Sequence, residues 1–124
     1  MKGQYQVELA GKVITVTFEG MFDEKTSIKV CRHVEDLIAS FNGEPFYMLI
    51  NLSNYQGSTP DAHKVGNDHA VWLEGQNCLG KAIVTNEQFM LNIVRNQQTQ
   101  LSQSQLVTKV FPSEEEAKVW LGSL

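Results

Sequence analysis

Hydroxyl, acidic and imidazole side chains gather between positions 58 and 69 of this chain. Ser58, His63 and Asp68 are the residue types of a nucleophile, a base and an orienting acid, so on paper they form a hydrolytic set. The Gly-x-Ser-x-Gly turn that presents such a serine in many hydrolases is absent, and no glycine-rich phosphate-binding loop occurs. We therefore predict no catalytic residues and no cofactor, and an enzyme is the weakest functional hypothesis.

Two of these hydroxyls, Ser58 and Thr59, stand directly before Pro60 and Asp61. This pattern is typical of a helix start, with a hydroxyl cap, proline at the first position and an acid near the positive end of the helix dipole. We interpret Thr59 first as a cap and Asp61 as a partner of the dipole. The alternative is regulatory: Ser58 or Thr59 is phosphorylated, and Asp61 acts as a fixed negative charge.

The two histidines of the same segment, His63 and His69, are poorly placed to share a metal ion. Their separation puts them about 120° apart around a helix, and no His-x-x-x-His pair occurs. We predict no metal site. His69 falls on the apolar face and is interpreted as a partly buried histidine, and Trp72 as a packing residue. The alternative is that His69, Tyr55 and Trp72 line a ligand pocket.

Length and charge restrict the class of protein. The 124 residues carry a formal net charge of −4, are 42% hydrophobic and suit a single domain. An acidic surplus without a run of Lys or Arg argues against nucleic acid. The longest apolar run, residues 46–50, is shorter than the roughly 20 residues of a membrane-spanning helix. The N-terminus has no apolar signal-peptide core, so we expect a cytoplasmic protein in which Cys31 and Cys78 are free thiols.

The spacing of apolar residues predicts a hairpin followed by a helix at the start of the chain. Residues 5–9 alternate between apolar and polar types, and residues 13–18 are rich in Val, Ile and Thr. The short turn between them predicts an antiparallel pair. Helical spacing of apolar residues then predicts an amphipathic helix over residues 23–41, capped by Asp23 or Thr26.

The middle of the chain predicts a buried strand and a second helix. The apolar run over residues 46–52, interrupted only by Asn51, is typical of a central strand that is covered on both faces. Residues 53–58 are polar and contain Gly, so we expect a loop there. The helix that starts at Thr59 is predicted to end at Gly75.

The remaining elements continue the alternation. Short apolar strands are predicted over residues 81–85 and 106–111, and a helix beginning at residues 86–87 lies between them. Ser113 with Glu116 forms a capping box that starts the last helix. The resulting order, β-β-α-β-α-β-α-β-α, predicts an α/β fold with a mixed, mainly parallel sheet of about five strands and four helices.

Three segments carry a resemblance to a known family. Residues 51–55 (NLSNY) with 60–62 (PDA) resemble its strand, loop and helix start, and residues 81–84 (KAIV) resemble its next strand. Residues 110–121 (VFPSEEEAKVWL) resemble its closing strand, acidic cap and Ala, Trp-Leu helix. With the order of elements, these segments look like the STAS domain of SpoIIAA-like proteins, the fold of bacterial anti-sigma-factor antagonists. The resemblance covers nearly all of residues 1–124 and implies one such domain.

The resemblance also implies a function. In family members of the classical kind a partner kinase phosphorylates a serine at the start of the second helix, and this changes protein binding. Here the matching position falls at Pro60 or Asp61, and the nearest hydroxyls are Ser58 and Thr59. The wider SpoIIAA-like group also resembles the lipid-binding SEC14 (CRAL-TRIO) fold, which implies a small apolar ligand as an alternative.

Two functional hypotheses follow. The first is a non-enzymatic regulatory or protein-interaction module with an unidentified protein partner; its surface is the expected loop and helix start, with Ser53, Tyr55, Ser58, Thr59 and Asp61. The second is a binding protein for a small apolar, lipid-like ligand, with a pocket between helices and sheet lined by Tyr55, His69 and Trp72. A deep apolar pocket would favour the second hypothesis. A homodimer about a two-fold axis is compatible with either.

Overall fold

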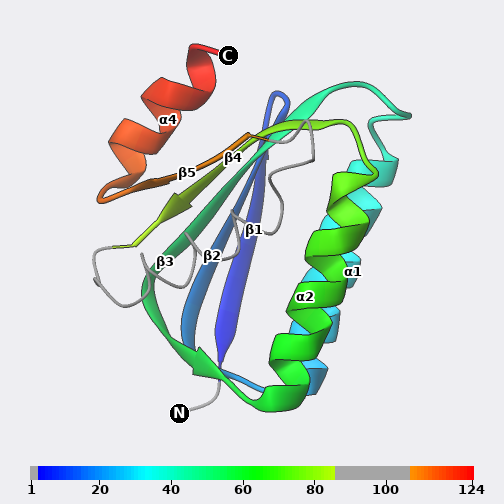
Figure 1. Ribbon diagram of the computed structural model, residues 1–124, viewed down its shortest axis with the longest axis vertical. Helices are drawn as coiled ribbons and strands as arrows, with labels where there is room; N and C mark the ends of the chain where they lie inside the picture. Colours follow the sequence, from blue (N-terminus) through cyan, green and yellow to red (C-terminus); the bar gives the residue numbers. More distant parts are fainter. Residues whose placement is uncertain (1–2, 86–106) are drawn as a thin grey trace.

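The computed structural model describes residues 3–85 and 107–124, which build one five-stranded sheet with its strands in chain order (Figure 1). The strands are β1 (Gln4–Ala10), β2 (Val13–Phe22), β3 (Phe46–Ser58), β4 (Cys78–Val84) and β5 (Val107–Phe111). β1 runs antiparallel to β2, and every other neighbouring pair is parallel. The predicted α/β class, the opening hairpin and the mixed, mainly parallel sheet are confirmed.

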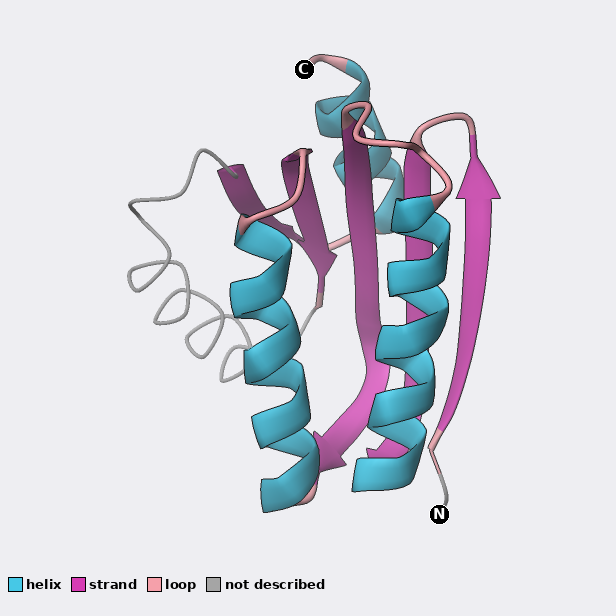
Figure 2. Ribbon diagram, turned by 90° about the vertical axis from the view of Figure 1, so that its right-hand side faces the viewer, coloured by secondary structure: helices cyan, strands magenta, loops and turns pink. Residues whose placement is uncertain are grey.

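Helices cover both faces of this sheet. α1 (Glu24–Ala39) and α2 (Pro60–Glu74) lie side by side on one face, and α4 (Glu114–Gly122) lies on the opposite face (Figures 1 and 2). The predicted helix that begins at residues 86–87 lies outside the described residues. Among the helices that the structure describes, none is long and apolar enough to cross a membrane.

The helix starts follow from local hydrogen bonds. Asp23, Thr59 and Ser113 each precede a helix, and each side chain accepts a hydrogen bond from the N–H three residues further on, at 2.8, 3.2 and 3.3 Å. Such contacts satisfy N–H groups that have no partner inside the helix. These three caps confirm the predicted starts, with Asp23 rather than Thr26 capping α1. Gly75 is the C-cap of α2, as predicted.

The predicted loop over residues 53–58 was wrong, because β3 continues through it to Ser58. β2 also runs further than predicted, to Phe22, and supplies a parallel neighbour for this extension. The register shifts near Gly20, and both Gly20 and Gly57 adopt positive φ, at 80° and 124°. Ladder hydrogen bonds from β2 therefore hold a polar segment extended that lacks strong strand propensity of its own.

Each face of the sheet has its own hydrophobic core. The core under α1 and α2 includes Val34 and Met48, and the core under α4 includes Leu49, Ala82 and Leu121. Met48 and Leu49 are adjacent in β3 and point to opposite faces, as strand geometry requires. The apolar run of the central strand therefore contributes to two cores, which confirms its predicted burial on both faces.

Candidate functional site

A cavity of about 360 Å³ lies between α1, α2 and the face of the sheet that these helices cover. Most of its wall is aliphatic or aromatic, with Val16 and Phe18 from β2, Met48 and Ile50 from β3, and Val34 from α1. These strand residues share one face because alternate residues of a strand point the same way. Figure 2 shows the two helices standing in front of the sheet on this side.

Hydroxyl groups lie at the end of the cavity where β3 passes into α2. The Tyr55 Oη and Ser58 Oγ atoms form a hydrogen bond, and both residues line the cavity. The Tyr55 ring is held against Phe18 and Phe22, with ring centroids 6.3 and 6.0 Å away. Both predicted site residues therefore turn inward, toward the cavity.

An amine, Lys81, also lines the cavity. Lys81 lies on β4 on the same face as Ile83, which lines the cavity as well. Some of its surface remains accessible, yet the protein around it desolvates the ammonium, and this lowers the pKa of Lys81. Among residues 3–85 and 107–124, no carboxylate forms an ion pair with it.

His69 is the second basic group in the wall. Burial, helped by the charge of Lys81, lowers the pKa of its imidazole from 6.5 to about 4. The ring is therefore neutral near pH 7, so its Nδ1, which is 3.8 Å from Glu35 Oε2, does not form an ion pair there. This Nδ1 is buried and has no hydrogen-bond partner among the described residues.

A thiol is a further titratable group of the cavity. Cys31 lines it from α1, and burial, with the nearby Glu35 charge, raises the pKa of this thiol to about 11. Desolvation is the largest cause of the shifts of Cys31, His69 and Lys81 alike. A ligand pocket produces such shifts as readily as an active site does, so they do not by themselves indicate catalysis.

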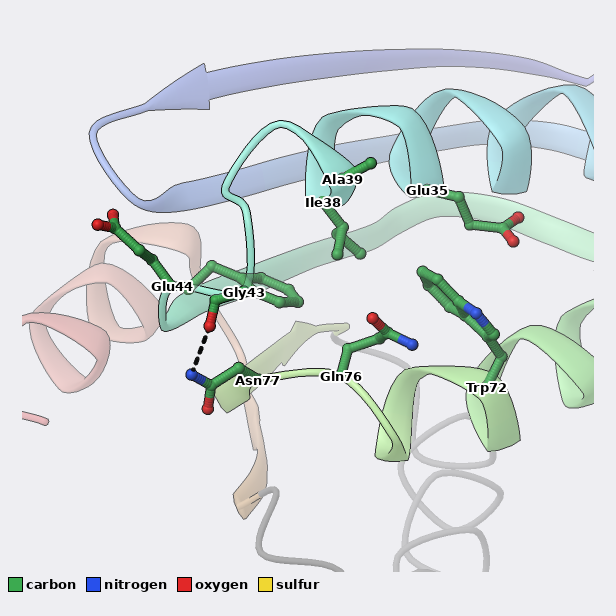
Figure 3. Close-up of a pocket in the computed structure, with 9 residues that line it drawn as sticks. Glu35, Ile38, Ala39, Gly43, Glu44, Trp72, Gln76 and Asn77 are labelled. Carbon is green, nitrogen blue, oxygen red and sulfur yellow. Dashed lines mark hydrogen bonds between the residues drawn. The ribbon is translucent and has the colours of Figure 1, made fainter.

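A smaller pocket of about 140 Å³ lies between the last turns of α1 and α2 (Figure 3). Trp72, Glu35 and Gln76 line it, and Asn77 Nδ2 donates a hydrogen bond to the Gly43 carbonyl across its rim at 3.0 Å. The three residues predicted for one ligand pocket are therefore divided between two sites. Tyr55 and His69 line the larger cavity, and Trp72 lines the smaller pocket.

The residues predicted for an interaction loop are divided as well. Thr59 and Asp61 are exposed at the start of α2, whereas Ser53, Tyr55 and Ser58 are half-buried in the extension of β3. Thr59 is also tied to β2, because its N–H donates to the Phe22 carbonyl at 2.9 Å. Residues 53–58 are therefore a strand rather than a solvated loop, and of the five predicted residues the exposed ones are Thr59 and Asp61 at the helix start.

The hypothetical hydrolytic set is not brought together. Ser58 and His63 line the cavity, but Asp68 is exposed on α2 and is not part of the wall. Within the described ranges, no group of three or more His, Cys, Asp or Glu residues is placed to hold a metal ion.

The sequence did not point to two titratable groups of the cavity, Lys81 and Cys31, as site residues. The available signal was Lys81 itself, a lone charge within the otherwise apolar run of residues 78–84. A charged residue in a strand that is covered on both faces requires a partner or a polar hollow.

This architecture is similar to that of known proteins. A family model described as SpoIIAA-like matches residues 13–122. A solved, uncharacterized protein of the DUF3478 family with a SpoIIAA-like fold, from Shewanella loihica PV-4, is similar at a TM-score of 0.77 and 14% identity, over 96% of this chain and 93% of that chain. An anti-sigma factor antagonist from Mycobacterium paratuberculosis is similar at 0.66 and 14%, over 97% and 94%. No curated protein matches the sequence.

Proposed function

The chain belongs to the SpoIIAA-like family, and we propose that it binds a small, largely apolar molecule between its helices and its sheet without catalysing a reaction. The observation that carries this proposal is the cavity of about 360 Å³. Ligand pockets commonly occupy about 300–1,000 Å³ and combine apolar walls with a few polar groups. The walls here are apolar, and the hydroxyls of Tyr55 and Ser58 supply polar groups at one end.

The energetics of an apolar hollow support an occupant. Val16, Val34 and Met48 belong to the buried core and also border the cavity. Side chains that face unfilled space lack dispersion contacts on that side, and a ligand that fills the space supplies them. Because such a ligand binds the folded chain and not the unfolded chain, it also raises the free energy of unfolding.

Native mass spectrometry of the freshly purified protein, followed by denaturing mass spectrometry of the same sample, tests this proposal. We expect extra mass that stays under gentle conditions and leaves on denaturation, and that mass identifies the ligand. A bare chain in both spectra, together with no shift of Tm on adding medium-chain apolar molecules, would contradict the proposal.

Two neighbouring residues of α2 offer a matched pair of variants. Ala70 lines the cavity, whereas Val71 does not and is 65% exposed. We expect Ala70→Phe to fill part of the cavity and to reduce the bound mass, and Val71→Phe to leave it unchanged. Circular dichroism checks that both variants fold. Equal ligand content in the two folded variants would place the ligand elsewhere.

A second function is favoured by a specific observation. The solved anti-sigma factor antagonist has the same fold, and Thr59 and Asp61 are exposed where β3 passes into α2. We propose this helix start as the contact surface of a regulatory protein-interaction module. Phosphate at a helix N-terminus is well tolerated and changes the surface charge.

Intact-mass analysis of protein purified from its own cells tests the regulated form of this module. We expect an increment of one phosphate that survives denaturation, maps to Thr59 or Ser58 and disappears from the corresponding alanine variant. Unmodified protein under every growth condition tried would rule out phosphorylation as the switch.

A further inference from the structure

We propose that the ligand of the cavity is an amphiphile with one carboxylate group, such as a medium-chain fatty acid, and that the amine of Lys81 pairs with this carboxylate. The inference rests on the proposed ligand-binding function and adds the chemical class of the ligand. It comes from the charge of the described cavity wall and from the position of Lys81 in the sheet.

The described wall of the cavity has basic residues but no acidic ones. It includes Lys81, His63 and His69, of which His69 is neutral near pH 7, and no aspartate or glutamate belongs to it. An apolar wall with an amine and no acidic residue complements a ligand that is apolar along its length and anionic at one end. A cationic amphiphile would meet an unfavourable charge there, and a neutral one would leave the amine without a partner.

The position of Lys81 explains why its amine needs such a partner. In the parallel register Lys81 lies beside Met48, and Ile83 lies beside Ile50, so the floor around the lysine is apolar. Burial disfavours the ammonium, and this lowers the pKa of Lys81. A ligand carboxylate next to the amine favours the charged ammonium, which opposes this lowering of the pKa, and forms a charge-assisted hydrogen bond with it.

Tyr55 and Ser58 line the cavity at the opposite end from Lys81. Both lie at the end of β3, beyond Leu52, whereas Lys81 is level with Met48 in the first half of that strand. The apolar tail of the ligand therefore has room to run along the floor from Lys81 past Ile50 toward the two hydroxyls. This arrangement fits an extended chain with one charged end better than it fits a compact neutral ring.

A set of three ligands with the same tail tests the inference on ligand-free protein. Isothermal titration calorimetry measures decanoic acid, 1-decanol and decylamine at one pH and salt concentration. We expect decanoic acid to bind roughly ten- to a hundredfold more tightly than 1-decanol, the range that one hydrogen bond to a charged group supplies. Decylamine is expected to bind most weakly of the three.

Lys81→Met keeps the apolar stem and removes the amine. We expect this variant to bind the acid and the alcohol with nearly equal affinity and to retain the affinity of wild type for the alcohol. Lys64→Met is the matched control, because Lys64 lies on α2, is exposed and does not line the cavity. It is expected to keep the preference for the acid.

The outcomes separate this inference from the proposed function. Equal binding of acid and alcohol by wild type, or a preference for acid that survives in Lys81→Met, overturns the pairing with Lys81 and leaves apolar binding intact. Failure of all three ligands to bind overturns both proposals. If Lys81→Met does not fold, the comparison of three ligands on wild type still decides whether the site selects a carboxylate.

Discussion

The imidazole of His69 stacks on the indole of Trp72 one turn further along α2, with 5.4 Å between the ring centroids and 29° between the ring planes. His69 lines the larger cavity, whereas Trp72 and Glu35 line the smaller pocket. The two stacked rings therefore lie between the two hollows. A change at either ring is expected to affect the shape of both, and the protonation of His69 would place a charge at this boundary.

Acid is expected to destabilise the protein through His69. The pKa of His69 is about 4 in the folded protein, against an ordinary value of 6.5, because burial disfavours the charged ring. Between these two pH values His69 is therefore protonated in the unfolded chain but largely unprotonated in the folded chain. Above about pH 6.5 this residue does not lower the free energy of unfolding. As the pH falls from 6.5 toward 4, the free energy of unfolding decreases by up to about 1.4 kcal/mol per pH unit.

Urea unfolding of wild type and His69→Gln across this pH range measures the effect. Other groups also titrate there, so the difference between the two proteins isolates His69. We expect the variant to lose less stability on acidification. His63→Gln is the control, because His63 is exposed on the same helix. Parallel curves for wild type and His69→Gln would contradict the prediction.

The cap of α2 is expected to contribute measurably to stability. Thr59 Oγ1 accepts the Ala62 N–H at 3.2 Å. Thr59→Ala removes the acceptor and should lower the free energy of unfolding by about 1 kcal/mol, while Thr59→Ser keeps a hydroxyl and should stay close to wild type. Urea denaturation of the three proteins provides the values. Equal losses in the two variants would show that the hydroxyl is not what matters at this position.

The core beneath α4 offers a contrast within one helix. Leu121 is 4% exposed and packs in the second core, whereas Val119 is 76% exposed. Leu121→Ala should lower the free energy of unfolding by about 2–5 kcal/mol, as is usual when a large buried side chain is truncated. Val119→Ala should change it by less than about 0.5 kcal/mol. Similar values for both would mean that α4 does not depend on this contact.

The thiol in the cavity is expected to react slowly. Burial raises the pKa of Cys31 from 9.0 to about 11, so its thiolate fraction near pH 8 falls about a hundredfold. Cys78→Ala leaves Cys31 as the single thiol. Labelling of this variant with Ellman's reagent should be at least that much slower in the folded protein than in denaturant. A bound ligand should slow it further, and a folded rate close to the denatured rate would contradict the prediction.

The sequence by itself was sufficient wherever the deciding contacts are local. Asp23, Thr59 and Ser113 reach N–H groups three residues away, so their patterns predicted where helices start. The apolar run over residues 46–52, interrupted only by Asn51, predicted a central strand, because a short apolar run bounded by turn residues suits a strand that is covered on both faces. The order of these elements, with the family resemblance, was enough to predict the fold.

Tertiary structure decided the path of residues 53–58 and the location of the site. Those residues are polar, and they are extended because β2, more than thirty positions earlier in the chain, runs beside them, as in the pairing of Gly20 with Tyr55. Tyr55 and His69 were predicted to share a pocket with Trp72. In the structure Tyr55 and His69 line the larger cavity, and Trp72, stacked on His69, lines the smaller pocket. Local propensity contains no information about a neighbour so distant in sequence.

The cavity itself could not be predicted for a related reason. Periodicity shows which face of a helix is apolar, but it does not show how far that helix stands from the sheet or which strand residues it leaves uncovered. The residues next to Lys81 in the sequence do not determine whether its amine contacts solvent, a carboxylate or an apolar cavity. Only the packing of α1 and α2 over β2, β3 and β4 places that amine in a cavity, because burial is set by all the elements that surround a residue.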